Sequence, residues 1–219
     1  CRGQRLHRLE LEPNASRRID IRTEFAPRYV GWELTLKCDL ACRHCGSRAG
    51  KAREEEFTLE EARDLAVQLG EMGAIEVTFI GGEAYLHPDW PQIVRAVADA
   101  GVRCTMTTGA RALDAAMCRR AAAAGMAGIS VSIDGMESTH DTLRAVPGSW
   151  DKAVSSLGHI RDAGIAPFAN TQINRLNIGE LEELSEVLLQ GGIKAWQVQL
   201  TGPMGRAADR PEWLLQPYD

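Results

Sequence analysis

The feature that most constrains the fold is a regular alternation of short strand-like runs with longer helical segments. The strand-like runs lie at 31–37, 75–80, 103–107, 128–133, 167–172 and 195–200. The helical segments lie at 59–72, 90–100, 112–124, 150–163 and 178–190. Repeated strand–helix units connect parallel strands through right-handed crossovers. We therefore expect an α/β fold, a partial (β/α)6 TIM-like barrel of parallel strands with outer helices; an open doubly wound sheet is the competing architecture.

Capping residues mark the ends of the expected helices. A glycine that favours a left-handed C-cap follows each helix, at Gly73, Gly101, Gly125, Gly164 and Gly191. Two helix starts have the spacing of a capping box, Thr58 with Glu61 and Asn177 with Glu180. These signals agree with the strand–helix alternation.

Composition and charge exclude several classes of function. The hydrophobic content of 44% and charged content of 25% are ordinary for a globular protein. A net charge of −5 argues against nucleic acid as a partner, because phosphate binding needs clustered lysine and arginine. No apolar run has membrane-spanning length and no signal-peptide pattern opens the chain, so we expect no membrane association. Six unevenly spaced cysteines do not resemble a disulfide framework, which favours a cytoplasmic location.

Three of the cysteines form one motif, Cys38-x3-Cys42-x2-Cys45, directly after the first expected strand. A closed zinc site needs four protein ligands, and iron–sulfur clusters usually take four thiolates. No fourth cysteine lies nearby, so the motif predicts a metal site with one open coordination position. Zinc, with His44 or Cys104 as its fourth ligand, is the alternative.

Polar residues follow two further strands. After the second strand come Gly81, Gly82 and Glu83; the glycines let backbone approach a ligand, and the carboxylate can hold an ammonium group. Ser132 and Asp134 end the fourth strand and place a hydroxyl and a carboxylate where a sugar diol could bind. A simple tight turn and satisfied strand-end polar groups are the structural alternatives. The carboxyl ends of parallel strands share one edge, so we expect these groups to converge.

Arg144 and Leu200 complete the predicted set. Arg144 follows the fourth strand, and an arginine fork suits a carboxylate ligand, although a surface ion pair is the alternative. Leu200 ends the sixth strand. An ammonium, a carboxylate and a ribose are all parts of S-adenosylmethionine (SAM).

Taken together, the chain resembles the radical SAM enzymes. The similarity covers 29–205 and is carried by the motifs Cys38-x3-Cys42-x2-Cys45, Gly81-Gly82-Glu83 and Ser132-x-Asp134. The resemblance implies that the three cysteines hold a 4Fe-4S cluster and that SAM binds its open iron. It implies SAM contacts from a group of polar and glycine residues, namely Gly81, Gly82, Glu83 and Asp134.

The resemblance also implies individual SAM contacts. Ser132 would contact the ribose, Arg144 the methionine carboxylate, and Leu200 would pack near the adenine. His44 stands where the family usually has a large aromatic residue against the adenine, and it can still stack. No catalytic side chain is predicted beyond these cofactor ligands.

The run from Ser132 to Trp150 is similar to a radical SAM subgroup that often carries a C-terminal SPASM or twitch domain. That similarity implies an enzyme that modifies a peptide or protein side chain, with an electron donor such as flavodoxin or ferredoxin. A small-molecule or cofactor-precursor substrate is the alternative, as is a non-catalytic iron–sulfur binding module. We expect 1–28 to be an N-terminal extension or the remnant of an upstream element, 29–219 to be the radical SAM core, and both ends to be truncated.

Overall fold

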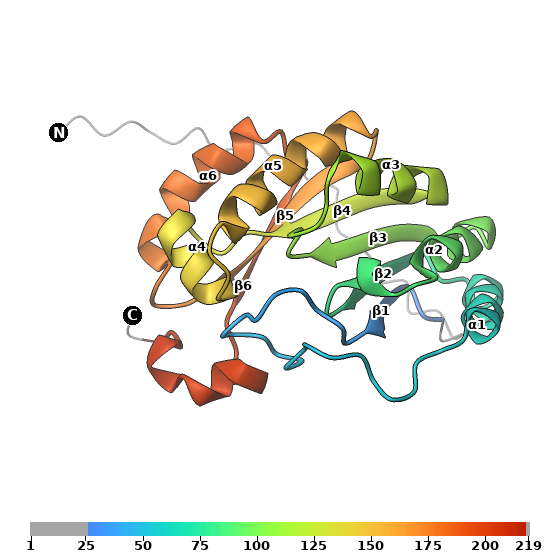
Figure 1. Cartoon of the computed structure of the whole chain (residues 1–219), viewed down its shortest axis with the longest axis horizontal. Coiled ribbons are helices and arrows are strands. Elements are labelled where there is room, and N and C mark those ends of the chain that lie inside the picture. The colour runs from blue at the N-terminus through green and yellow to red at the C-terminus, as the bar shows by residue number, and fades with distance from the viewer. Residues whose placement is uncertain (1–25, 218–219) are drawn as a thin grey trace, which may run out of the picture.

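The computed structural model describes residues 26–217. The expected N-terminal extension therefore lies almost entirely outside the described residues. Six parallel strands form a single sheet (Figure 1): β1 Tyr29–Thr35, β2 Glu76–Gly81, β3 Arg103–Thr108, β4 Met126–Ser132, β5 Ala166–Ile173 and β6 Trp196–Leu200. The helices are α1 Leu59–Glu71, α2 Trp90–Asp99, α3 Ala115–Ala124, α4 Glu137–Arg144, α5 Ser149–Asp162 and α6 Leu181–Gln190.

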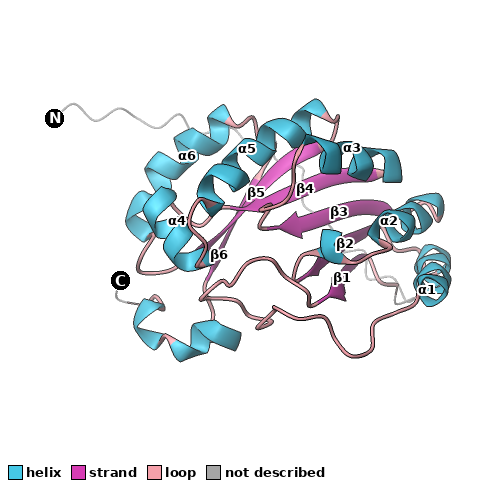
Figure 2. Ribbon diagram, in the orientation of Figure 1, coloured by secondary structure: helices cyan, strands magenta, loops and turns pink. Residues whose placement is uncertain are grey.

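The order of strands in the sheet is the order in the chain, β1 to β6. Right-handed crossovers between consecutive parallel strands place every helix on the same side of the sheet. Figure 2 shows the labelled helices α1 to α6 along one face of the magenta strands. The expected partial (β/α)6 barrel is therefore confirmed, and the doubly wound sheet, which would have helices on both faces, is not formed.

The core lies between the sheet and its helices. Alternate residues of the strands, such as Val77, Phe79 and Ile129, pack there against helix residues such as Ile93 and Leu157. All five of these side chains are fully buried. This alternation is the period-2 pattern of a strand with one face against helices. No helix within the described part of the chain has both the length and the apolar character to cross a membrane.

Most predicted caps are confirmed and two are wrong. Thr58 and Glu61 form the capping box of α1, and the first four predicted glycines have φ between 76° and 100°. Gly191 is right-handed with φ −65°, and the left-handed position is taken by Gly192. The Asn177–Glu180 capping box does not form, because both side chains contact the segment after β4 instead.

Helix α4 was not among the expected helices. It is short, and its N-cap residue Met136 offers no side-chain acceptor. Its first turn is held by Glu180, whose carboxylate accepts hydrogen bonds from the Met136 N–H at 2.8 Å and from the Thr139 hydroxyl at 2.5 Å. A cap supplied from more than forty residues away leaves no local sequence signal.

Candidate functional site

The three motif cysteines lie on a long loop after β1, residues 36–58, which we call the cluster loop. Cys38, Cys42 and Cys45 all line one cavity of about 170 Å³ at the carboxyl ends of the strands. The cavity is also lined by most of the other predicted residues, namely His44, Gly81, Gly82, Glu83, Ser132 and Arg144. The predicted convergence at this edge of the sheet is therefore observed for nine of the eleven predicted residues.

The remaining two predicted residues do not line the cavity. Leu200 is 70% exposed at the end of the edge strand β6. Asp134 is fully buried, and its carboxylate faces other protein groups. The Asp134 carboxylate is therefore directed at His44 and Arg144 and not into the cavity.

The glycine pair lets the cluster loop pack onto the end of β2. The Gly82 N–H donates to the Thr35 carbonyl at 2.7 Å, and the Glu83 N–H donates to the Lys37 carbonyl at 2.8 Å. A Cβ at Gly82 would lie only 2.2 Å from the Lys37 carbonyl oxygen. Glycine is therefore required here by the backbone of the cluster loop, and not only by a ligand.

Burial shifts the pKa values of two of the three cysteines on the cluster loop, Cys38 and Cys42. It raises the pKa of Cys38 to about 12 and also raises the pKa of Cys42. At Cys42 the Arg144 guanidinium counteracts burial, because its NH1 donates to the Sγ at 3.6 Å. Metal ligation requires thiolates, so these thiols become good ligands only when a cation compensates their charge.

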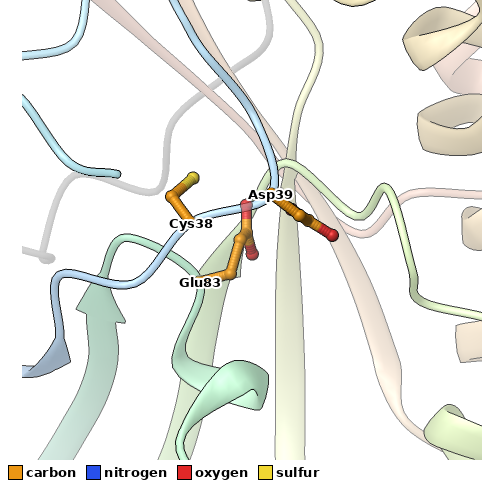
Figure 3. Close-up of side chains that lie close together, drawn as sticks. All are labelled: Cys38, Asp39 and Glu83. Carbon is orange, nitrogen blue, oxygen red and sulfur yellow. The ribbon is translucent and has the colours of Figure 1, made fainter. Parts of the chain in front are cut away.

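Glu83 is a buried carboxylate beside Cys38. Burial raises its pKa to about 7, although the Thr108 hydroxyl and the Gly109 N–H, 2.7 Å away, both donate to it. One ligating atom each from Cys38, Asp39 and Glu83 lie within 4.8 Å of one another (Figure 3). The carboxylates of this trio already accept protein hydrogen bonds, Asp39 from the Tyr85 hydroxyl at 3.1 Å. The trio therefore does not form a closed metal site.

A buried charge network lies behind the cavity. Oδ2 of Asp134 lies 2.5 Å from NH2 of Arg144 and 2.9 Å from Nε2 of His44. Burial acts to raise the pKa of Asp134, but Arg144 and His44 outweigh it and hold that pKa below its usual range. The Asp134 N–H donates to Nδ1 of His140, and burial lowers the pKa of His140 to about 4. Asp134 therefore fixes the positions of two cavity residues, Arg144 and His44.

Arg206 is a cavity residue that sequence reasoning missed. Its Nε donates to the Cys42 carbonyl at 2.6 Å, and its NH1 donates to the Ala49 carbonyl at 3.1 Å. Its backbone N–H donates to the Cys45 carbonyl at 2.9 Å. The segment after β6 thus braces the cluster loop, as the proximity of the red and blue segments in Figure 1 indicates. The partners are more than 150 residues apart, and no local pattern predicts the contact.

The donor set fits a cluster with one open iron and an amino-acid ligand. Three cysteines line the cavity, whereas Cys104 is buried in the core with its Sγ directed at the Val94 carbonyl. Cys104 is therefore not the fourth ligand of a zinc site. Nδ1 of His44 and Nε of Arg144 are buried without a hydrogen-bond partner among the described residues. Buried polar atoms are rarely unpaired, so both nitrogens are positions for a polar ligand.

Comparisons with known proteins identify the family. The family model of the radical SAM superfamily matches residues 32–188. An AdoMet-dependent heme synthase of Nitratidesulfovibrio vulgaris is 32% identical over 86% of this chain and 52% of the relative. Mycofactocin maturase MftC of Mycobacterium tuberculosis is 30% identical over 84% of this chain and 47% of the relative. The chain thus spans about half the length of these curated relatives.

Solved structures share the fold. Streptococcus suis SuiB bound to S-adenosylmethionine superposes with a TM-score of 0.75 at 16% identity, over 89% of this chain and 44% of SuiB. SuiB bound to its precursor peptide SuiA gives a TM-score of 0.73 at 17% identity, over 81% of this chain and 40% of SuiB. At this level of identity the likeness shows the fold alone.

Proposed function

The chain belongs to the radical SAM superfamily, and from that premise we propose that it is the core of an enzyme that modifies a side chain of a peptide or protein. The family uses a 4Fe-4S cluster and SAM. When bound, these cofactors supply a 5′-deoxyadenosyl radical that abstracts a hydrogen atom from the substrate. The single observation that carries the proposal is the convergence of three cysteines, Glu83 and Arg144 on one cavity.

The residues of this chain would divide the binding of the cofactors. Cys38, Cys42 and Cys45 would hold the cluster as thiolates. Glu83, at the end of β2, would hold the ammonium group of SAM, because an adjacent cation favours its ionised form. Gly81 and Gly82 would line this position with backbone.

The opposite side of the cavity would bind the rest of SAM. Arg144 would pair with the carboxylate through the guanidinium that Asp134 positions, and Ser132 would contact the ribose. His44 would stack near the adenine, with Leu200 at the edge of the site. In this scheme Asp134 acts through Arg144 and His44, because its carboxylate already faces both.

Two groups of relatives favour different substrates. Mycofactocin maturase and the peptide-bound structure of SuiB support a peptide substrate. The heme synthases and an Fe-coproporphyrin III synthase of Methanosarcina barkeri, 28% identical, favour a second candidate, a tetrapyrrole substrate. We retain the peptide as the principal proposal. The remaining expectations, a core at 29–219, a flavodoxin or ferredoxin as electron donor and a cytoplasmic location, are part of it.

Cofactor cleavage is the test of this proposal. We expect the anaerobically reconstituted and reduced protein to convert SAM into 5′-deoxyadenosine and methionine, which chromatography would detect. A protein with an intact cluster that forms neither product would contradict the proposal and favour the non-catalytic iron–sulfur module.

A further inference from the structure

The face of the sheet opposite the helices, which we call the concave face, holds a second cavity. This concave-face cavity has a volume of about 350 Å³. Its lining includes residues of five neighbouring strands, among them Thr78, Thr105, Ser130, Phe168 and Gln197. Thr107 lines both this cavity and the cavity of the cysteines, so the two cavities adjoin.

The concave face is unusual for a barrel interior. Layers of branched apolar side chains fill the interior of a complete TIM barrel. Here short hydroxyl side chains take several of those positions, beside Phe168, and the hydroxyls of Thr78 and Thr105 lie 2.8 Å apart. The Thr105 hydroxyl also lies 2.9 Å from the Glu76 carboxylate. Short polar side chains leave space for a ligand and offer hydrogen bonds to it.

Four carboxamides, which we call the carboxamide patch, extend this surface over β5 and β6. In the parallel register Asn170 is opposite Gln197, and Gln172 is opposite Gln199. Nε2 of Gln197 lies 3.5 Å from Oε1 of Gln199, and Oδ1 of Asn170 is buried without a hydrogen-bond partner among the described residues. Gln172 lines the cavity of the cysteines and Gln197 lines the concave-face cavity. The patch therefore spans both cavities.

In the part of the chain that the structure describes, the concave-face cavity is lined by one arginine, Arg103, whose Nε lies 3.7 Å from the Glu76 carboxylate. A tetrapyrrole presents several carboxylates and a wide apolar ring, which call for available cations and an apolar slot. Carboxamides offer one acceptor and two donors, which match the carbonyl and N–H of a peptide group.

We propose that the concave face binds an uncharged, amide-bearing segment of a peptide substrate, with the carboxamide patch pairing with its backbone amides. The proposal rests on the proposed function and names the substrate class of the same site. It selects the peptide over the tetrapyrrole on the chemistry of the lining. A peptide segment held there would lie next to the cavity of the cysteines, where the reactive carbon of the cofactor would be generated.

The test measures binding of two probes to the full chain, reconstituted with its cluster and SAM but not reduced. Acetyl-Gly-Asn-Ser-Gly-amide is followed by saturation-transfer NMR, and iron coproporphyrin III by its Soret band. Gln197→Leu removes one carboxamide of the patch. Gln190→Leu, the same change at an exposed position of α6, is the matched control.

We expect the peptide to bind and its Kd to rise about fivefold in Gln197→Leu but not in Gln190→Leu, since one net hydrogen bond is lost. We expect no saturable Soret shift with the tetrapyrrole. Absent peptide binding, peptide binding that Gln197→Leu leaves unchanged, or saturable tetrapyrrole binding that Gln197→Leu weakens would each overturn the proposal. SAM cleavage by the reduced wild-type protein, without either probe, tests the proposed function separately, so the two failures are distinguishable.

Discussion

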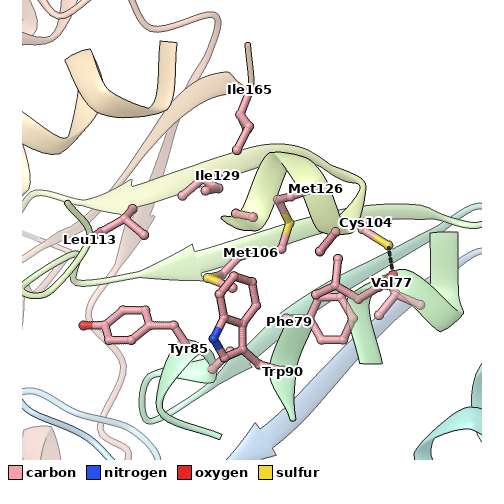
Figure 4. Close-up of a cluster of buried hydrophobic side chains, with 14 of the residues drawn as sticks. Val77, Phe79, Tyr85, Trp90, Cys104, Met106, Leu113, Met126, Ile129 and Ile165 are labelled. Carbon is pink, nitrogen blue, oxygen red and sulfur yellow. Dashed lines mark hydrogen bonds between the residues drawn. The ribbon is translucent and has the colours of Figure 1, made fainter. Parts of the chain in front are cut away.

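The two faces of the sheet differ sharply although the same strands build both. Toward the helices the strands present Val77, Phe79, Met106 and Ile129, which pack into one apolar cluster (Figure 4). Toward the concave face many of the intervening positions are hydroxyl or amide residues such as Thr78, and Phe168 lies among them. Apolar burial on the convex face stabilises the fold, which leaves the concave face and the carboxyl ends of the strands free for polar groups that bind ligands. Along a strand, the residues that stabilise the core therefore alternate with the residues that are available to bind a ligand.

The largest expected contrast is between Cys42, which lines the cavity of the cysteines, and Cys104, which lies in the apolar core. Cys42→Ala removes a predicted cluster ligand and should abolish the absorption at roughly 400 nm together with SAM cleavage. Cys104→Ala, in the core, should retain both and lower the free energy of unfolding by ~1 kcal/mol, because a small buried side chain is truncated. Absorption spectra and denaturant unfolding check both variants. A Cys42→Ala protein that keeps a normal cluster would break the contrast.

Two adjacent residues of β2 give the next contrast. Phe79→Ala should cost ~3–5 kcal/mol of unfolding free energy, because it leaves a cavity in the convex core. Thr78→Ala should cost only ~1 kcal/mol, since it removes one partly exposed hydroxyl, with its contacts to Thr105 and Glu76, on the concave face. Urea unfolding curves measure both losses. Equal losses would show that the concave face contributes to the core as much as the convex face does.

His140 should make stability depend on pH. Its pKa is about 4 in the folded protein, against 6.5 for an unperturbed histidine, so the unfolded chain binds more protons between these values. The associated stability is fully present above pH 6.5 and is lost as pH falls toward 4, by up to ~3 kcal/mol. His140→Gln retains an acceptor for the Asp134 N–H without a titrating ring. Unfolding curves at several pH values should show a flatter profile for this variant; an unchanged profile would contradict the assignment.

The smallest expected effect is at the start of α1, far from the site. Thr58→Ala removes the side-chain half of the capping box and should cost ~1 kcal/mol of unfolding free energy. SAM cleavage should stay at the wild-type rate, because α1 contributes no residue to the cavity of the cysteines. Thermal unfolding and a product assay measure the two quantities. A clear loss of cleavage would link the helical layer to the site more closely than the contacts indicate.

Local patterns predict most of this fold. Strand–helix alternation, the Thr58 capping box and the glycines after the helices are signals within a few residues, and the structure confirms them except at Gly191. The position of the site also follows from the topology, because the ends of parallel strands share one edge. This is why Glu83 and Arg144 could be expected beside the cysteines from the sequence.

Contacts between distant segments could not be predicted in this way. Glu180 caps α4 from across the fold, and Arg206 braces the cluster loop from beyond β6. Asp134 matches the motif in sequence, yet its carboxylate is directed to Arg144 and His44 instead of the cavity. Such pairings depend on three-dimensional packing and leave no periodic trace in the chain.

The central claim is that SAM binds directly at a cluster held by Cys38, Cys42 and Cys45. The most direct measurement is the electron paramagnetic resonance spectrum of the reduced cluster with and without SAM. A nucleoside-bearing amino acid that binds the open iron changes the electronic environment of the cluster, so we predict that added SAM alters the g-values and line shape. A spectrum of the reduced, three-cysteine cluster that saturating SAM leaves unchanged would contradict the claim.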